Sequence, residues 1–384
     1  MTTVTFTLLA LVVLVGLLGP LLAARARWRI PAVVGELAGG LLIGSSGLGL
    51  LDSTDGTVTL LANIGFGLTM VVVGSHVPVR DPAVRAAIGP GALGAALVGL
   101  GAVVLAILMA GVFGTGHAAL YGVLIASSSA ALVLPMLQSS GLGGRSTAQL
   151  VAQIAIADVA CIVALPMVLA PARVLQVALT GLGIAVAAAL LALLLIRFGR
   201  TDLRERLHHF SEERGFALEL RFSLLVLFAF ASVAQLGSVS IMVAGFALGL
   251  VLAAAGEPRR LARQLFGITE GFFGPFFFVW LGASINLHGL ISHPQMLLLG
   301  VSLGAAAVLA HLAARLARLP LLQAAASAGQ LGVPVAAVTL GLQSGVLVSG
   351  EDAGILLGAL VTVVASAVAT GMLARANHGA GEGT

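Results

Sequence analysis

The sequence predicts an all-α polytopic membrane protein. Of its 384 residues, 59% are hydrophobic and 9% are charged, and the mean hydropathy is +1.12. Soluble domains do not have this composition. Apolar runs of about 20 residues, enough helix to cross the hydrocarbon of a bilayer, recur along the whole chain. The short loops between them leave no room for a soluble catalytic or nucleotide-binding domain.

Hydropathy divides the chain into about 13 expected transmembrane helices. We expect residues 1–374 to form one transmembrane domain, and residues 375–384, which are rich in glycine, to form a short disordered cytoplasmic tail. In chain order the expected helices lie at 4–24, 30–51, 57–75, 86–113, 117–140, 146–171, 173–197, 218–236, 238–255, 265–287, 295–317, 320–344 and 351–373.

The basic residues give the expected orientation in the membrane. All of them are arginines, and all except Arg173 cluster after odd-numbered helices of this series. Because basic loops stay in the cytoplasm, we expect a multi-pass protein of the cell (plasma) membrane, with its N-terminus outside and its C-terminus in the cytoplasm. The net charge of +4 therefore reflects topology in the lipid bilayer, and no nucleic-acid partner is expected.

Two of the expected helices contain residues that break a helix at membrane depth. The stretch 126–135 reads ASSSAALVLP, and the stretch 327–336 reads SAGQLGVPVA. Serine and glycine are poor helix formers, and proline removes a backbone hydrogen bond. Backbone that leaves the helix inside a bilayer has to line a cavity or be buried in protein. The stretches are an odd number of helices apart and so run in opposite directions, which predicts inverted repeats with two broken crossing helices.

Asp158 lies in the middle of the helix expected at 146–171. A carboxylate at that depth costs about 2.5–3.5 kcal/mol on insertion scales, a cost that chains tolerate mainly where the group binds a cation or a proton. We expect Asp158 to bind a monovalent cation, with Ser127, Ser128, Ser129, Gln330 and the freed carbonyls of the broken helices completing its shell. Desolvation disfavours the charged form of a carboxyl group, so the same site can hold a proton instead. A site that holds one or the other while crossing the membrane is that of an antiporter.

Three further polar residues are expected at helix ends or along the ion path. Gln153 lies on the same helix as Asp158 and is expected to line the cytoplasmic entry. Glu36 and Glu270 each follow an arginine into a helix, which indicates gating or helix-end contacts. Water near the cytoplasmic face is expected to keep both glutamates ionised. Only Asp158 is then left to alternate between proton and cation, which predicts electroneutral exchange, one for one.

Four segments carry a resemblance to a known family. They are PAVVGELAGGLLIGSSGLGLL (31–51), LANIGFGLTMVVVGSHV (61–77), GRSTAQLVAQIAIADV (144–159) and GPFFFVWLGASINL (274–287). On these motifs the chain resembles the membrane domain of the cation:proton antiporter superfamily, in the branch of potassium-efflux antiporters and bacterial sodium/proton exchangers. The resemblance covers essentially all expected helices, and the first motif is the most specific.

This resemblance implies a sodium/proton antiporter-like fold. The fourth to sixth and the eleventh to thirteenth helices would form a core that carries the ion and moves against a scaffold, which is expected to form a homodimer. The function implied is secondary active antiport of Na⁺ or K⁺ against H⁺, without a cofactor. The chain departs from the family at Ser45, where proline is usual, at Asn63 and Asn286, where acids are usual, and at Ala157, where Asn, Asp or Gln precedes the carboxylate.

Other functions remain open from the sequence. A sodium-coupled organic-anion symporter of related fold would need an anion site beside the cation site. A non-transporting sensor would explain Ala157. A channel is disfavoured because nothing resembles a repeated filter loop. The chain is not expected to be an enzyme, because it has no P-loop, HExxH, CxxC or GxSxG motif, and serines 127–129 have no histidine or lysine at the expected depth to activate them.

Overall fold

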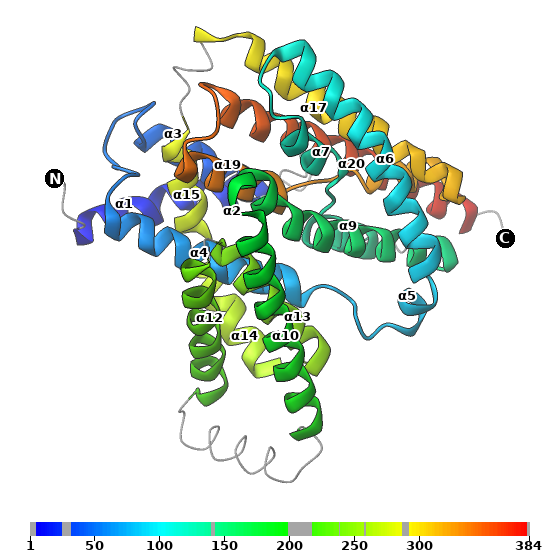
Figure 1. Ribbon diagram of the computed structural model, residues 1–384, viewed down its shortest axis with the longest axis horizontal. Coiled ribbons are helices and arrows are strands. Elements are labelled where there is room, and N and C mark those ends of the chain that lie inside the picture. Colours follow the sequence, from blue (N-terminus) through cyan, green and yellow to red (C-terminus); the bar gives the residue numbers. More distant parts are fainter. Residues whose placement is uncertain are drawn as a thin grey trace. The chain divides into compact units, whose positions relative to one another are not determined.

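A computed structural model describes residues 5–24, 32–139, 143–198, 217–237, 239–256, 259–285 and 292–381 (Figure 1). All regular structure in these ranges is helical, which confirms the all-α prediction. The chain forms two compact units. Unit 1 comprises Met1–Val77 and Leu175–Ile285, and unit 2 comprises Pro78–Val174 and Asn286–Thr384.

Unit 1 is formed by a set of α-helices and one π-helical turn. They are α1 (Phe6–Gly16), α2 (Leu18–Ala23), α3 (Ala32–Ile43), α4 (Gly56–Ser75), α10 (Val174–Phe198, which begins at the boundary), α12 (Leu218–Leu236), α13 (Ile241–Ala255), α14 (Arg259–Ile268), the π-helical turn η2 (Thr269–Phe273) and α15 (Gly274–Ser284).

Glycines allow the helices of unit 1 to pack backbone against backbone. A Cβ atom placed on Gly40 of α3 would lie 2.0 Å from the carbonyl oxygen of Val279 in α15. One placed on Gly282 of α15 would lie 2.2 Å from the carbonyl oxygen of Leu37 in α3. Small residues at helix interfaces permit this approach in membrane proteins, where van der Waals packing drives helix association.

Unit 2 is built from two series of the same form, each with a long helix, a broken helix and another long helix. The first consists of α6 (Ile88–Phe113), α7 and α8 (Ala118–Ala126 and Ala130–Ser139) and α9 (Arg145–Leu169). The second consists of α17 (Gln295–His311), α18 and α19 (Leu321–Ala326 and Gly332–Ser344) and α20 (Glu351–Gly381). The short elements α5 (Pro82–Ala86), η1 (Pro171–Arg173) and η3 (Leu312–Ala317) complete the unit.

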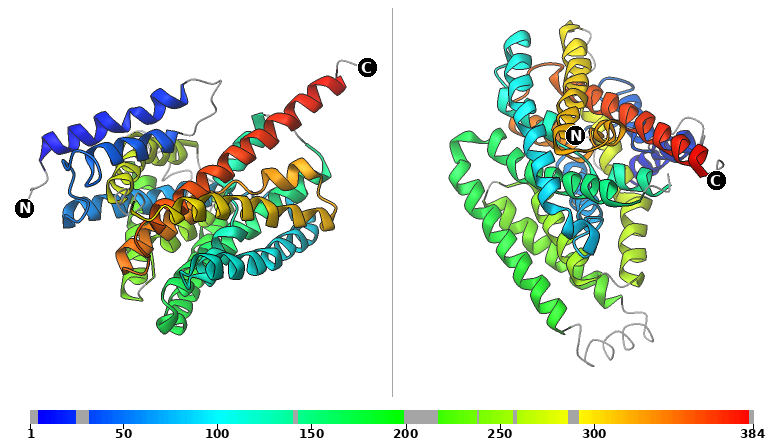
Figure 2. Two further views of the ribbon diagram at one scale, coloured as in Figure 1. Left: turned by 90° about the horizontal axis from the view of Figure 1, so that it is seen from above. Right: turned by 90° about the vertical axis from the view of Figure 1, so that its right-hand side faces the viewer.

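These are the segments from which the sequence predicts an ion-carrying core. Helix α6 lies beside α17 (Figure 1), and α20 packs across α17 (Figure 2). Helix α20 continues to Gly381, into the region for which a disordered tail is expected, and residues 382–384 lie outside the described part of the chain.

Nine helices among the described residues are long and apolar enough to cross a membrane. Shorter apolar helices lie in other expected segments, at Ala32–Ile43, Ile241–Ala255 and Gly332–Ser344. The chain is thus a multi-pass membrane protein, and the helices missing from the nine are those that are short or interrupted.

Both helix breaks are shorter than the sequence predicts. The first is Ser127–Ser129, and the helix resumes at Ala130 and continues through Pro135. The second is Ser327–Leu331, and Pro334 lies in the first turn of α19. A proline is tolerated in a first turn because no intrahelical partner exists there for its missing N–H. The prolines of both stretches therefore lie in the helices that resume after the breaks.

Candidate ion site at the helix crossing

The two helix breaks contact each other directly in unit 2. The backbone N–H of Ser129 donates to the carbonyl of Gly329 at 2.9 Å. The hydroxyl of Ser128 donates to the carbonyl of Ser327 at 2.8 Å. Ser127, Ser128, Ser129 and Ser327 are all at most 2% exposed. Backbone groups that are freed in one break are therefore satisfied by the other, as burial away from water requires.

Asp158 lies beside this crossing. It is on α9, it is 1% exposed, and its Oδ2 accepts a hydrogen bond from the backbone N–H of Ala130 at 3.2 Å. Ala130 is the first residue of α8, so the carboxylate faces the positive end of that helix dipole. Ala130 also follows Ser129, which bonds to the second break. No salt bridge to Asp158 forms among the described residues, so a buried carboxylate stands here without a basic counter-ion.

The serines predicted as ligands have different roles in the structure. The hydroxyl of Ser127 donates to Leu124 O at 2.9 Å at the end of α7, and that of Ser128 donates across to the second break. Each hydroxyl oxygen keeps lone pairs that can coordinate a cation. Ser129 contributes its backbone N–H to the crossing, and its carbonyl accepts from Val133 at 3.0 Å. The structure brings the three serines together next to Asp158.

Gln330 lies in the second break, and Gln153 of α9 contacts that break. Gln330 is 3% exposed, its backbone N–H donates to Thr362 Oγ1 at 3.2 Å, and its Nε2 has no hydrogen-bond partner among the described residues. Gln153 is 1% exposed, and its Nε2 donates to Ser327 Oγ at 3.4 Å. The sequence places Gln153 on the entry path. In the structure it is buried at the crossing, because Gly94 of α6 leaves room for its side chain.

His311 contacts the site, so the expectation that no histidine lies at the depth of serines 127–129 is wrong. It is 0% exposed, its Nδ1 lies 2.8 Å from Ala307 O, and its Nε2 lies 3.1 Å from Ser128 Oγ. A carbonyl only accepts, so Nδ1 carries a proton. When the His311 ring is neutral, the single hydroxyl proton of Ser128 has two acceptors, Ser327 O and His311 Nε2. The sequence shows only a lone histidine in an apolar helix. Its partner Ser128 is 183 residues away in the sequence, so no local pattern identifies the contact.

Helix α20 holds the second break in place. Thr362 Oγ1 accepts from Gln330 N, and Ser366 Oγ donates to the carbonyl of Ala326 at 2.7 Å. Both side chains are fully buried. Since α18 ends at Ala326, the hydroxyl of Ser366 satisfies a carbonyl that has no partner within its own helix.

Glu36 and Glu270 belong to unit 1 and differ from one another. Glu270 is exposed in the turn η2. Glu36 is only 6% exposed, so the expectation that water bathes it is wrong. The reason is the close packing of α2 on α3. A Cβ atom on Gly19 would lie 2.8 Å from Glu36 Cγ, so the missing side chain at Gly19 lets the glutamate be covered.

The fold and this site together define a helical membrane protein in which broken helices cross beside a buried carboxylate, a pattern of secondary transporters. Residues 9–376 match the family model described as "Sodium/hydrogen exchanger, transmembrane". The chain therefore belongs to the sodium/hydrogen exchanger family, within the cation:proton antiporter superfamily that its motifs resemble.

Similar proteins carry antiporter names. YjbQ of Bacillus subtilis strain 168, by its name a proposed Na⁺/H⁺ antiporter, is 26% identical over 310 residues, which are 76% of this chain and 49% of YjbQ. The chain thus spans about half the length of that curated relative. Two structures of the sodium proton antiporter MjNhaP1 from Methanocaldococcus jannaschii share the fold. Their TM-scores are 0.65 and 0.67, their sequence identities 19% and 18%, and they cover 96% and 97% of this chain and 97% and 98% of their own.

Proposed function

We propose that this protein is a secondary active antiporter that exchanges a monovalent cation, Na⁺ or K⁺, for H⁺ by alternating access at Asp158. The observation that carries the proposal is the buried carboxylate of Asp158. It accepts a hydrogen bond from Ala130, the first residue of α8, next to the backbone contact between the two breaks. Membership of the exchanger family and the antiporter relatives support the same function.

The chemistry follows from the surroundings of Asp158. An unpaired charge away from water costs several kcal/mol, so the carboxylate needs a positive partner while it crosses the membrane. A proton or a cation supplies that charge, and the carboxylate holds one of them at a time. The lone pairs of the Ser127 and Ser128 hydroxyls, the carbonyls of the breaks and the Gln330 amide would supply the other oxygens of a cation site.

The same reasoning gives the stoichiometry. Asp158 is the carboxyl group of the crossing, and serine hydroxyls do not titrate. Exchange of one proton for one cation at a single carboxylate moves no net charge, so we propose that the exchange is electroneutral. We further propose that the protein acts as a homodimer in the cell membrane, with its N-terminus outside and its C-terminus in the cytoplasm.

Exchange in proteoliposomes tests the proposal. Purified protein is reconstituted with an internal pH indicator, and Na⁺, K⁺ and Li⁺ gradients are applied separately. Asp158→Asn should abolish cation-driven proton flux, since an amide does not titrate and carries no charge to balance that of a cation. The variant should still fold, because it removes a buried charge and adds none.

A matched variant controls for reconstitution. Asp52→Asn makes the same chemical change at an exposed residue outside the helices, where the carboxylate accepts from Thr54, and it should exchange like the wild type. Flux that persists in Asp158→Asn would overturn the assignment of the site. A wild-type protein that moves neither protons nor cations would overturn the function.

A further inference from the structure

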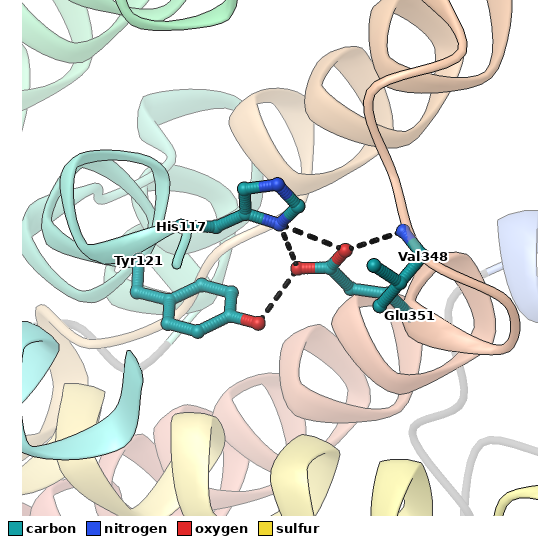
Figure 3. A network of polar contacts seen from close by, with 4 residues as sticks. All are labelled: His117, Tyr121, Val348 and Glu351. Carbon is teal, nitrogen blue, oxygen red and sulfur yellow. Dashed lines mark hydrogen bonds and ion pairs between the residues drawn. The ribbon is translucent and has the colours of Figure 1, made fainter. Parts of the chain in front are cut away.

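A second buried carboxylate lies in unit 2, at the first residue of α20. Glu351 is 0% exposed. Its Oε1 accepts from the hydroxyl of Tyr121 at 2.6 Å and lies 2.8 Å from His117 Nδ1 (Figure 3). Its Oε2 lies 3.0 Å from the same nitrogen and accepts from Val348 N at 2.9 Å. Two side chains from the beginning of α7 therefore converge on one carboxylate at the beginning of α20.

Helix capping explains only part of this arrangement. Glu351 N donates to Val348 O at 3.0 Å while Val348 N donates to Glu351 Oε2, a reciprocal pair like that of a capping box but with the Val348 carbonyl in place of a capping side chain. A glutamine would serve as well in that position. Capping needs neither His117 nor Tyr121, so their contacts require a separate reason.

The proton positions show what His117 can do. An ionised carboxylate only accepts hydrogen bonds, so Nδ1 of His117 carries a proton in this contact. Its Nε2 is then free to gain or lose a second proton, and the side chain is 20% exposed, which gives that proton a route. Imidazole changes charge between pH 5 and 8. With His117 protonated, Glu351 has a counter-ion. With His117 neutral, only hydrogen bonds stabilise the buried charge.

Few other charges can act on this pair. Among the helices packed against α7 and α20, the four helices α6, α8, α18 and α19 carry no titratable side chain. The first turn of α17 lies beside the first turn of α20, because a Cβ placed on Gly354 would lie 2.7 Å from Met296 O. His311 is the last residue of α17 and is therefore at the end of that helix away from Glu351. The remaining titratable groups are Tyr121 in the network, Asp352 next to Glu351, His293 before α17, Arg145, Asp158 and Cys161 on α9, and Arg375 and His378 near the other end of α20.

The pair links the helices that hold the two breaks. Helix α7 ends where the first break begins, at Ser127. Helix α20 holds the second break through Thr362 and Ser366. A bond between the beginnings of α7 and α20 therefore constrains the positions of both breaks from one end of the unit.

We propose that His117 and Glu351 form a second proton-binding site, separate from Asp158, that acts as a pH-controlled latch. Protonation of His117 completes an ion pair that ties α7 to α20 and slows rearrangement of the crossing. Loss of that proton weakens the tie and allows exchange. The effect on exchange rests on the proposed antiport, but the ion pair itself does not, so the two can be tested separately.

The first measurement needs no transport. The ion pair exists only while His117 is charged, so its contribution to the Tm of the detergent-solubilised protein should be present at low pH and lost as the pH rises. His117→Gln keeps an N–H donor for Glu351 but cannot gain charge, and Glu351→Gln keeps the capping box but removes the charge. Both variants should lose this part of the pH dependence. Tyr121→Phe removes one hydrogen bond and leaves both charges, so it should lower Tm equally at every pH and keep the dependence.

The second measurement uses exchange at saturating cation, where competition between cation and proton at Asp158 is suppressed. The wild-type rate should fall by about tenfold per pH unit on the acid side, the slope of one titrating group. His117→Gln and Glu351→Gln should remove that fall and match the wild type at pH 8. Wild-type behaviour of both variants in Tm and rate would overturn the latch, as would equal loss of pH dependence in Tyr121→Phe. Loss of transport in the wild type with the Tm result intact would overturn the antiport and leave the ion pair standing.

Discussion

Ser128 connects the two breaks with one hydroxyl group. That hydroxyl donates to Ser327 O at 2.8 Å, it lies 3.1 Å from His311 Nε2, and it is next to the serine whose N–H bonds to Gly329. Gln330 holds its own break through a backbone bond to Thr362 and leaves its side-chain amide available. Each residue thus shapes its break, and we propose that each also offers an oxygen to a cation.

Replacement of either residue should therefore weaken cation binding more than it slows turnover. A hydrogen bond contributes about 0.5–1.5 kcal/mol, so Ser128→Ala and Gln330→Ala should each lower cation affinity roughly fivefold. The maximal rate should change less, because neither side chain carries the exchanged proton. The cation concentration that gives half-maximal proton flux in proteoliposomes measures this effect.

Ser344→Ala is the matched control for that series. This serine is at the exposed end of α19, where its hydroxyl donates to carbonyls of its own helix, so cation affinity should not change. If Ser128→Ala lowers the maximal rate and leaves cation affinity unchanged, Ser128 is not a cation ligand and contributes only to the conformational change of the transport cycle.

At the scale of the elements, contact between α3 and α15 depends on the absence of side chains. The backbone of each helix occupies the place where the other would carry a Cβ, at Gly40 and at Gly282. The same principle operates in α6, where Gly94 leaves room for Gln153. Close backbone packing is the source of stability here, since apolar surface gains little from contact with another helix when lipid is the alternative.

Gly40→Ala should consequently destabilise the protein although alanine is the better helix former. The added methyl group would lie 2.0 Å from Val279 O, so the helices must separate, at a cost of typically 1–3 kcal/mol for such overpacking. Gly99→Ala in α6 meets nothing within 4 Å and should instead stabilise by up to about 1 kcal/mol through helix propensity. The Tm values of the two variants in detergent should move in opposite directions. A Gly40→Ala protein as stable as the wild type would show that the α3–α15 contact can relax.

At the scale of the whole molecule, the chain consists of two compact units, and unit 2 contains Asp158, both breaks, His311 and the latch. The titratable groups of the proposed ion site and of the proposed latch are therefore within one unit, which is built from the two similar series of helices. Glu36 and Glu270 are in the other unit. This division predicts that charge movement is a property of unit 2.

Membrane potential should not affect the exchange if Asp158 alone alternates between proton and cation. Proton flux driven by a cation gradient is measured in proteoliposomes with the potential clamped at several values by an ionophore. The rate and the equilibrium point should be the same at each value. A shift with potential would mean that a second charge moves with the carboxylate and would contradict the one-for-one mechanism. Tests of His311→Gln and His117→Gln would then show which group carries it, since removal of that group should abolish the shift.

The sequence was sufficient for the features that depend on composition and local conformation. The hydropathy predicted an all-helical membrane protein. The serines at 127–129 and the glycines near Gln330 predicted where helices break, because helix propensity is a local property. The prolines of the two stretches did not mark where the breaks end, because Pro334 lies in a first turn, where its N–H would have no partner, and Pro135 lies within α8. Asp158 was found because a charge in a long apolar run stands out in any fold.

Only the tertiary structure determined which groups meet. His311 and Ser128, Gln153 and Ser327, and Glu351 and His117 are contacts between residues far apart in the sequence. The burial of Glu36 depends on a glycine in a neighbouring helix. Hydropathy treats each helix separately and records that a polar residue lies in the membrane, but not which neighbour it faces. The free energy of a buried polar group depends on that neighbour, so its role in the protein was set by packing between helices.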